Sequence, residues 1–370
     1  MKQITNTEAK ILELLKKDPY LEQEEIALRL GMSRSSVAGH LARLIKKGFL
    51  QRGYILSDSG YEIAVIGGAN VDIKGIAGAA FRLATSNPGQ VSKSPGGVAR
   101  NVAENLARLH LAVSLYTAVG LDSEGEWLVK KTAEAGVNVQ HIEHLAGERT
   151  GIYLSILDDR REQIASISDM AIIERLNTDY LTAILANLLH AKMVFLDTNL
   201  PQSSLALLIN WLKEQNIPII IDPVSAKKAE KLQGLLNGLF LITPNKEEAE
   251  VLSGLPIRTA EDLPAVANKL LSQGVKQLII TLGQEGVFIA DAKQQLLLPS
   301  SGTEIVDTTG AGDSFIAGVI YGLTKGASII AASRYGSALA SLTLASKQTV
   351  VADLTAKMLE KRMKEIIIDE

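Results

Sequence analysis

The stretch Asp307-Thr308-Thr309-Gly310-Ala311-Gly312-Asp313-Ser314-Phe315 decides the fold of this chain of 370 residues. It comes after a strand-like stretch, residues 304–306, and opens an apolar helical run over residues 315–323, so small residues stand where a helix begins. The first amide groups of a helix have no partner within that helix, and glycines let a phosphate approach them closely. Asp313 adds a carboxylate beside the same turn that can accept the proton of a hydroxyl group. An anion cradle next to a base predicts phosphoryl transfer to an alcohol.

Taken alone, Gly310-Ala311-Gly312 would be explained better by close packing between a strand and a helix than by a binding site. The whole nonapeptide, however, resembles the signature of the ribokinase-like (PfkB) carbohydrate and nucleoside kinases. This resemblance implies that Asp313 is the catalytic base and that the amides of Gly310, Ala311, Gly312 and Asp313 stabilise the charge that develops during transfer. A P-loop is a weak alternative, because the sequence holds no Gly-Lys pair that could supply its lysine.

Composition and charge exclude several classes of protein. A chain of this length suits one large α/β domain with an appendage, and a hydrophobic share of 46% with a charged share of 21% is typical of a globular protein. The absence of cysteine excludes disulfides, thiolate nucleophiles and cysteine-containing zinc sites. There is no run of about 18 uncharged apolar residues, and charges are scattered over the first helix, so we expect no membrane span, no signal peptide and a cytoplasmic protein.

Residues 1–57 are predicted to fold as a separate winged helix-turn-helix domain. A first helix carries an apolar stripe and ends at Asp18-Pro19, a short second helix stops at Gly31, and Ser33 can cap a third. Residues 46–50 and 53–56 are then expected to form the two strands of a β wing, and residues 57–60 a short linker. Over its whole length this segment resembles the DNA-binding domains of bacterial transcription factors.

The predicted exposed face of the third helix carries groups suited to phosphates and base edges: Arg34, Ser35, Ser36, His40 and Arg43. Residues 1–57 hold ten Lys and Arg against six Asp and Glu, a net charge of +4, whereas the rest of the chain holds 28 against 35, a net charge of −7. Positive charge gathered in the N-terminal domain predicts binding to duplex DNA. The alternative is a dimerisation or docking module, because winged helices also serve those roles and the local charge is modest.

Residues 61–370 are predicted to form the kinase domain. Apolar strands are expected over residues 63–66, 191–196, 217–221, 239–242 and 277–281, with amphipathic helices such as residues 203–214 between them. Continuous apolar strands separated by helices predict a buried, mostly parallel sheet, whose ligands bind at the carboxyl ends of the strands. The resemblance to the PfkB kinases implies an α/β three-layer sandwich with a small β lid built from segments of about 72–95 and 150–170.

Two motifs are predicted to hold the acceptor. Asn70 and Asp72 follow the first strand, and one carboxylate can accept hydrogen bonds from two adjacent hydroxyl groups of a sugar. Gly96 and Gly97 open a helix with Asn101 one turn in, a pattern that resembles the first signature of the same family. The resemblance implies that Asp72, Gly97 and Asn101 bind the ribose and that Asn70 supports them. Without it, the first motif could be a turn with a helix cap.

Two further motifs are predicted to hold the nucleotide. Asn245 and Glu248 match the Asn-x-x-Glu motif of the family, whose residues organise Mg²⁺ and its waters around the phosphates of ATP. Without that resemblance they would be a helix start whose acidic residues offset the dipole. Thr281, Gly283 and Gly286 end another expected strand and resemble the loop beneath the phosphates and ribose of ATP, although a hairpin would show the same spacing.

A monovalent cation is implied by the same resemblance. In relatives, the positions of Asp307 and Thr309, with backbone near residues 341–346, form a site for such an ion, here expected to be K⁺. The cofactors that we expect are therefore ATP and Mg²⁺, with K⁺ as an additional ion.

The stretches at residues 85–89, 95–101, 153–155 and 168–170 narrow the resemblance to the bacterial pseudouridine kinases. A nucleobase needs polar partners from a lid, so Asp169 could accept an N–H of the C-linked uracil while Tyr153 or Met170 covers the ring. Asp169 could equally be a solvated turn residue. Ribose, another nucleoside or a sugar amine stays open as the acceptor, because uncharacterised kinases with the same N-terminal extension share these features.

Three functions remain open at this point: a metabolic kinase, a ligand-responsive regulator without activity, and a protein that combines both. A regulator could lose its base and still bind ligand, whereas Asp313 and its anion cradle are intact. We therefore favour an active kinase, expected to be a homodimer, that carries a DNA-binding domain.

Overall fold

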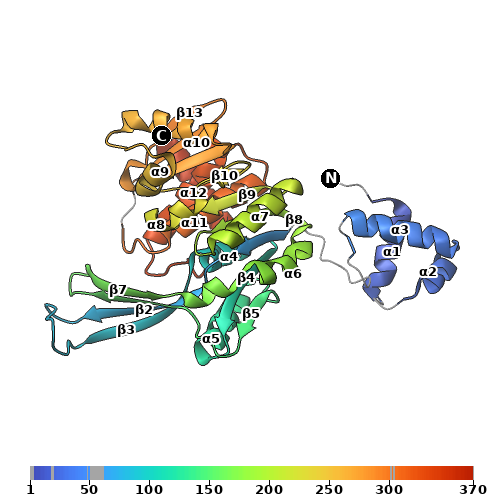
Figure 1. Ribbon diagram of the computed structural model, residues 1–370, viewed down its shortest axis with the longest axis horizontal. Coiled ribbons are helices and arrows are strands. Elements are labelled where there is room, and N and C mark those ends of the chain that lie inside the picture. Colours follow the sequence, from blue (N-terminus) through green and yellow to red (C-terminus); the bar gives the residue numbers. More distant parts are fainter. Residues whose placement is uncertain are drawn as a thin grey trace. The chain divides into compact units, whose positions relative to one another are not determined.

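The computed structural model describes residues 4–17, 21–47, 49–50, 62–300, 302 and 305–369. The chain divides into two compact units, Met1–Glu62 and Ile63–Glu370 (Figure 1). In the described part of the chain, no helix is both long and apolar enough to cross a membrane.

The N-terminal unit contains three helices, α1 (Asn6–Lys17), α2 (Gln23–Leu30) and α3 (Arg34–Lys47). Gly31 ends α2 in the left-handed conformation with a φ of 63°, and Ser33 Oγ accepts a hydrogen bond from the amide of Ser36 at the start of α3. These predicted helices are confirmed. The first predicted wing strand, residues 46–50, is wrong at its start, because Lys46 and Lys47 are the last residues of α3. Residues 53–56 of the predicted wing and the predicted linker, residues 57–60, lie outside the described residues. Apolar side chains of all three helices and of two flanking residues form one core: Ile11, Leu12, Leu15, Leu21, Ile26, Ala27, Val37, Leu41, Leu44 and Leu50.

The larger unit is built on a sheet of nine strands in the order β13-β12-β11-β10-β9-β8-β1-β4-β5. Strands β8, β9, β10 and β11 are parallel to one another, and so are β1, β4 and β5. At one edge of the sheet, β12 is antiparallel to β11, and β13 is antiparallel to β12. The strands are β1 (Glu62–Ile66), β4 (Val113–Gly120), β5 (Ile142–Leu145), β8 (Ala191–Asp197), β9 (Ile219–Asp222), β10 (Leu241–Ile242), β11 (Gln277–Thr281), β12 (Val287–Asp291) and β13 (Gln295–Leu298).

Helices cover both faces of this sheet, so the predicted three-layer α/β sandwich is confirmed. Ile63 and Val65 of β1 belong to one core, and Ala64 and Ile66 belong to the other, because successive side chains of a strand point to opposite faces. The first core is completed by α4 (Val98–Arg108), α5 (Ser123–Glu134), α11 (Ala311–Thr324), α12 (Ile329–Leu344) and α13 (Ala356–Asp369). The second is completed by α6 (Thr178–Leu188), α7 (Gln202–Glu214), α8 (Ala226–Ala229), α9 (Lys246–Ser253) and α10 (Leu263–Ser272).

A second sheet of four strands forms the lid and extends away from the main sheet (Figure 1). Its order is β3-β2-β6-β7, in which β2 and β6 are parallel and the outer strands are antiparallel to them. Its strands are β2 (Asn70–Ala77), β3 (Gly89–Gly96), β6 (Ile152–Leu157) and β7 (Gln163–Asp169). β2 begins close to the end of β1, so the lid starts at the edge where ligands of parallel sheets bind.

One expected strand is absent. Ile305 and Val306, predicted to be strand-like, are irregular, and Glu304 lies outside the described residues. The amide of Val306 donates to the carbonyl oxygen of Leu344 at 2.8 Å, so the end of α12 replaces a neighbouring strand as its partner.

Candidate active site

A cavity of about 240 Å³ lies at the carboxyl-terminal edge of the main sheet. Its walls come from the segments after β8 and β9, from the first turns of α4 and α11, and from the three lid strands β2, β6 and β7. Most of the predicted acceptor residues are thereby brought together with the predicted base. The lining residues are Asn70, Asp72, Gly97, Val98, Asn101, Tyr153, Ser168, Met170, Asn199, Val224, Lys228, Thr309, Gly310, Asp313 and Thr349.

Asp313 stands in the first turn of α11, whose N-cap is Gly310 in the left-handed conformation with a φ of 81°. A Cβ at Gly310 would lie 2.3 Å from the carbonyl oxygen of Thr349, so only glycine fits there. Gly310 and Asp313 line the cavity, whereas Ala311 and Gly312 do not, and the amide of Ala311 donates to the carbonyl oxygen of Thr308 at 3.3 Å. Asn101 Nδ2 donates to Asp313 Oδ2 at 2.8 Å, which leaves the other carboxylate oxygen able to accept a hydroxyl proton.

The ionisation of Asp313 is tuned by its surroundings. Burial raises the pKa of Asp313 to about 7, and the nearby carboxylates of Asp197 and Asp72 add to the rise. The hydrogen bond from Asn101 and the charge of Arg100 act in the opposite direction. A carboxyl group with a pKa near neutrality suits a general base.

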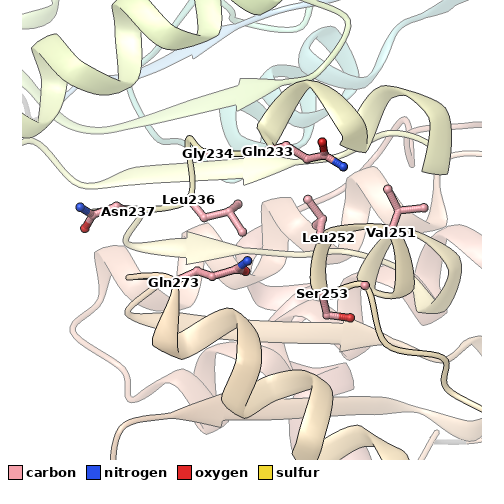
Figure 2. A pocket seen from close by; sticks show the side chains of 9 residues that line it. Gln233, Gly234, Leu236, Asn237, Val251, Leu252, Ser253 and Gln273 are labelled. Atoms are coloured by element: carbon pink, nitrogen blue, oxygen red, sulfur yellow. The ribbon is translucent and has the colours of Figure 1, made fainter.

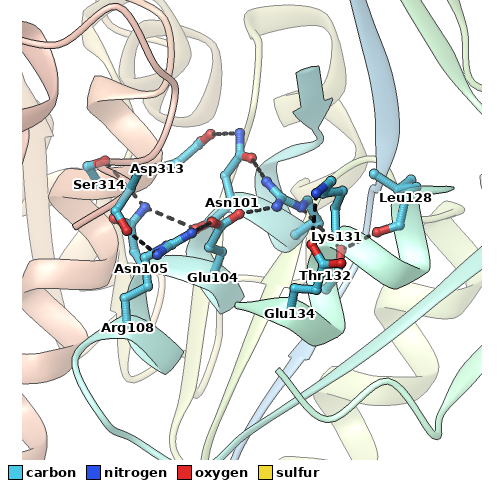
Figure 3. Close-up of polar contacts among 12 residues, drawn as sticks. Asn101, Glu104, Asn105, Arg108, Leu128, Lys131, Thr132, Glu134, Asp313 and Ser314 are labelled. Carbon is cyan, nitrogen blue, oxygen red and sulfur yellow. Dashed lines mark hydrogen bonds and ion pairs between the residues drawn. The ribbon is translucent and has the colours of Figure 1, made fainter. Parts of the chain in front are cut away.

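Arg100, which was not among the predicted site residues, fixes the orientation of Asn101. Its guanidinium is buried, and Nη1 donates to Asn101 Oδ1 at 3.0 Å. Because a guanidinium only donates, Asn101 must present its oxygen to Arg100 and therefore its NH₂ group to Asp313. Glu104 forms ion pairs with both Arg100 and Arg108. Figure 3 shows the pair of Glu104 and Arg108. The spacing Arg100, Glu104, Arg108 on one helix was the signal available in the sequence.

The acceptor motif is assembled around Asp72. Asn70 Nδ2 donates to Asp72 Oδ1 at 2.6 Å, and burial raises the pKa of Asp72. Gly96, predicted to bind the acceptor, does not line the cavity; a Cβ there would lie 2.3 Å from Asp72 Oδ2, so Gly96 makes room for that carboxylate. Gly97 lines the cavity with a φ of 99°, and a Cβ at this position would clash with the Cα of Ala69.

The predicted role of Asp169 requires a correction. Tyr153, Ser168 and Met170 line the cavity, but Asp169 is exposed and does not. Ser168 pairs with Tyr153 across β6 and β7, and the next residue of a strand points to the opposite face. On β7, the polar side chain that lines the cavity is therefore Ser168, one residue before the predicted Asp169.

The predicted nucleotide residues meet at the ends of β10 and β11, outside the lining of this cavity. Asn245 and Thr281 form an isolated parallel bridge. Gly283 and Gly286 both have positive φ, of 60° and 102°, and a Cβ at Gly286 would lie 2.0 Å from the carbonyl oxygen of Leu298. The bridge thus joins the two predicted nucleotide motifs, and the second motif forms a tight turn that requires glycine.

Asn245 and Glu248 form a capping box at the start of α9. Glu248 Oε2 accepts from the amide of Asn245 at 2.9 Å, and Oε1 accepts from Asn245 Nδ2 at 2.7 Å. Each carboxylate oxygen keeps a lone pair that could accept from a water molecule, so the pair fits the hydration shell of Mg²⁺ better than direct coordination. Within the described residues, no group of three or more Asp, Glu or His side chains could hold a metal directly.

The carboxylate of Asp307 contacts a cation of the chain itself, and the predicted K⁺ site stays a prediction. Lys74 Nζ of β2 lies 2.8 Å from Asp307 Oδ2, while Oδ1 accepts from the amide and hydroxyl of Thr309 at 2.9 and 2.6 Å. The amide of Asp307 also points to the carbonyl oxygen of Leu344, one of the backbone groups expected to face the ion. A lysine ammonium thus stands where a monovalent cation was predicted.

Three more titratable side chains at or near the site were not predicted: Asp197, Asp222 and Lys228. Asp197 and Asp222 end the apolar strands β8 and β9, which is the signal that could have identified them. Asp197 is buried and accepts from the amides of Gly68 and Ala99. Burial, and to a smaller extent repulsion from Glu248 and Asp313, raises the pKa of Asp222 well above its usual value. Lys228, the one cation in the cavity lining given above, donates to Asn199 Oδ1 at 2.6 Å.

A larger cavity of about 400 Å³ lies near the opposite edge of the sheet, beside the residues that lead into β10 and the last turns of α9 and α10 (Figure 2). Its lining has amides and one hydroxyl but no titratable side chain: Gln233, Gly234, Leu236, Asn237, Val251, Leu252, Ser253, Gly254 and Gln273. Volume alone would favour this cavity, whereas the base and the acceptor carboxylate lie in the smaller one.

The predicted DNA-contacting residues lie on α3. Arg34, Ser35 and Arg43 are exposed and Ser36 is half-buried, but the His40 side chain is only 15% exposed, so its predicted exposure is wrong. Arg43 reaches back to the buried carboxylate of Glu8. Burial alone would raise the pKa of Glu8, yet hydrogen bonds, first of all from Lys47, hold it at about 2. The C-terminal half of α3 is therefore tied to α1.

Comparison with known proteins agrees with this geometry. The sequence profile of the pfkB family carbohydrate kinases matches residues 61–356, and that of the winged helix-turn-helix DNA-binding family matches residues 4–51. A solved structure, a putative sugar kinase from Clostridium perfringens, superposes with a TM-score of 0.74 at 30% identity and covers 84% of this chain and 97% of its own.

Two curated proteins of Escherichia coli (strain K12) are similar over most of the chain. The uncharacterized sugar kinase YeiI is 36% identical over 93% of this chain and 94% of its own length. The pseudouridine kinase is 34% identical over 79% of this chain and 93% of its own length. The similarity to YeiI extends into the N-terminal unit, because a match over 93% of the chain must include part of it.

Proposed function

Because this chain belongs to the pfkB family of carbohydrate kinases, ATP-dependent phosphotransferases that act on hydroxyl groups, we propose that its acceptor is pseudouridine, phosphorylated at the 5′-hydroxyl. The observation that carries the reaction class is one cavity holding a base, Asp313, the amides of a helix start and the acceptor carboxylate Asp72. The similarity to pseudouridine kinase and the polar lid residue Ser168 support the acceptor.

The chemistry that we propose is a direct in-line transfer. Asp313, in its ionised form, accepts the proton of the 5′-hydroxyl, whose oxygen forms a bond to the γ-phosphorus of ATP as the bond to the ADP oxygen breaks. The amides of residues 310–313 donate to the oxygens of the transferred group. Asp72, held by Asn70, accepts from the vicinal hydroxyls of the ribose. Mg²⁺, held through waters by Asn245 and Glu248, would offset the phosphate charge when bound.

Pseudouridine is expected to give a higher kcat/KM than uridine, ribose or fructose. Its C-linked uracil offers an additional N–H group, and Ser168 and Tyr153 are the polar side chains that β7 and β6 contribute to the cavity lining. An unpaired polar group in such a site costs about 1 to 3 kcal/mol, so the preference over uridine should be about 10-fold or more. Steady-state ADP formation with each acceptor measures it.

A matched pair of lid variants tests the assignment of Ser168. Ser168→Ala should lower kcat/KM for pseudouridine by about 10-fold, while Asp169→Ala, one residue further on the opposite strand face, should leave it unchanged. A preference for ribose or a hexose would refute the acceptor and leave the kinase class standing. In that case another nucleoside or a sugar would be the substrate.

For the N-terminal unit, we propose duplex DNA as the partner. The winged helix-turn-helix match covers residues 4–51, and the exposed start of α3 presents Arg34 and Ser35. Arg34 lies 3.7 Å from Glu24 in an exposed pair, a contact weak enough to be exchanged for a phosphate. The chain would then combine two functions: it would act as a kinase, and it would regulate transcription in response to a sugar or nucleoside.

DNA binding should depend on Arg34 and weaken as salt rises, because each neutralised phosphate releases condensed counterions. Replacing Arg34 and Arg43 by Ala should weaken binding and reduce the salt slope by about 1 for each phosphate that is no longer neutralised, with kinase activity intact. Lys10→Ala, which removes an exposed charge from α1, is the control. Fluorescence anisotropy with the upstream DNA of its own gene at two salt concentrations measures the effect. Absence of binding at low salt would make the unit a docking module.

A further inference from the structure

Lys74 connects the lid to the loop that precedes the anion cradle. It lies on β2 two residues after Asp72, so both side chains are on the same face of the strand. Its ammonium contacts Asp307 Oδ2 at 2.8 Å, and both partners are largely shielded, with side-chain exposures of 29% and 24%. The other oxygen of Asp307 holds the amide and hydroxyl of Thr309. One chain of contacts thus runs from the acceptor lid to the residue before Gly310.

The charge of Asp307 needs compensation where it stands. It is three residues before the N-cap of α11, where the amides of residues 310–313 would receive the transferred phosphoryl group. An uncompensated carboxylate there would repel the phosphates of ATP, an effect that is strong in a partly buried site. The two oxygens of Asp307 accept three hydrogen bonds, one from Lys74 and two from Thr309, and the ammonium of Lys74 supplies the opposite charge. A bound monovalent cation would meet the same need.

We propose that the ammonium of Lys74 is a built-in cation that takes the place of a bound K⁺ at Asp307. It neutralises the carboxylate, keeps Asp307 in position to hold Thr309, and so fixes the loop that enters the anion cradle. Because the cation belongs to the chain, phosphoryl transfer does not require a monovalent ion from solution. This inference rests on the kinase activity of the family and is independent of which acceptor is used.

The test is the dependence of rate on monovalent cations at constant ionic strength, with choline, Na⁺ or K⁺ as the chloride. The unaltered chain should turn over at the same rate in all three. Lys74→Met should be about 10- to 100-fold slower in choline, because the loop and the phosphates lose their compensating charge. K⁺ added to this variant should restore most of the rate with a saturating dependence, since the emptied position can then hold the ion.

Lys93→Met is the matched control. Lys93 lies on the neighbouring lid strand β3, pairs with Glu124 at 3.4 Å and covers the ring of Trp127, away from the cavity lining. This variant should keep both the rate and the indifference to cations. If Lys74→Met behaved like Lys93→Met in choline, the ammonium would have no role at this site.

Two other results would overturn the proposal: activation of the unaltered chain several-fold by K⁺, or a loss of rate in Lys74→Met that K⁺ does not repair. A second readout requires no acceptor. K⁺ should raise the melting temperature of Lys74→Met and leave that of the unaltered chain unchanged, at equal ionic strength in choline. This measurement separates failure of the built-in cation from failure to find the correct acceptor.

Discussion

Asp313→Asn is expected to lower turnover by about 10² to 10⁴-fold while ATP and the acceptor still bind, which is the usual worth of a positioned general base. The amide has nearly the shape of the carboxylate, so the turn at Gly310 and the contact to Asn101 can stay in place. It cannot accept the hydroxyl proton, and the attacking oxygen then carries its proton into the transition state. Single-turnover ADP formation, beside calorimetric binding of each ligand, separates the two effects.

The dependence of kcat on pH provides a second test of the role of Asp313. Burial raises the pKa of Asp313 to about 7, and the base works only when ionised, so kcat should rise as pH increases through 7 and level off above it. In Asp313→Asn this rise should disappear, and the residual rate should be nearly flat over the same range. Turnover close to that of the unaltered chain, or a rise with pH that survives the substitution, would place the base elsewhere.

The parts of the site that sequence could reveal are those formed by neighbours in the chain. Gly310 and Asp313 lie in a single turn, and Gly97 and Asn101 lie in another, so a local pattern carries their roles. Lys74 and Asp307 are 233 positions apart and meet only because β2 folds over the start of α11. No local pattern reports such a meeting, so the sequence could not show that Lys74 contacts the carboxylate of the predicted K⁺ site.

Errors of one residue have a different cause. The lid strand β7 has no buried residue along its length, so its sequence shows no alternation from which to decide which side chains face the cavity. Asp169 was chosen for its chemistry, and the register of β7 on β6 turns Ser168 inward instead. The inner strands of the main sheet were predictable for the opposite reason: strands such as β8 and β11 are mostly buried and show as apolar runs, whereas the edge strands β5 and β13 are largely exposed and were not predicted.

The network behind the base also makes the kinase domain dependent on a single carboxylate, Glu104. Arg100 is 2% exposed and pairs with Glu104, which also accepts from Arg108 Nη2 at 2.6 Å. A buried guanidinium is tolerated because its charge is paired and its donors are satisfied. Removing Glu104 would leave that charge buried. Among the described residues, Thr132 and Asn101 would still accept its hydrogen bonds, and Asp72 would be the remaining nearby negative charge.

Glu104→Ala is therefore expected to destabilise the kinase domain by about 3 to 5 kcal/mol, the usual cost of breaking a buried ion pair on one side. Both tryptophans of the chain, Trp127 and Trp211, lie in this domain, so urea unfolding followed by their fluorescence reports on it alone. The midpoint of unfolding should fall by on the order of 1 M urea.

Glu134→Ala is the control, since Glu134 also pairs with a cation, Lys131 at 2.8 Å, but in an exposed position near the same network (Figure 3). Its midpoint should stay unchanged, because exposed pairs contribute little. Equal shifts in the two variants would mean that Arg100 finds other compensation and that burial of the pair does not govern the stability of this site.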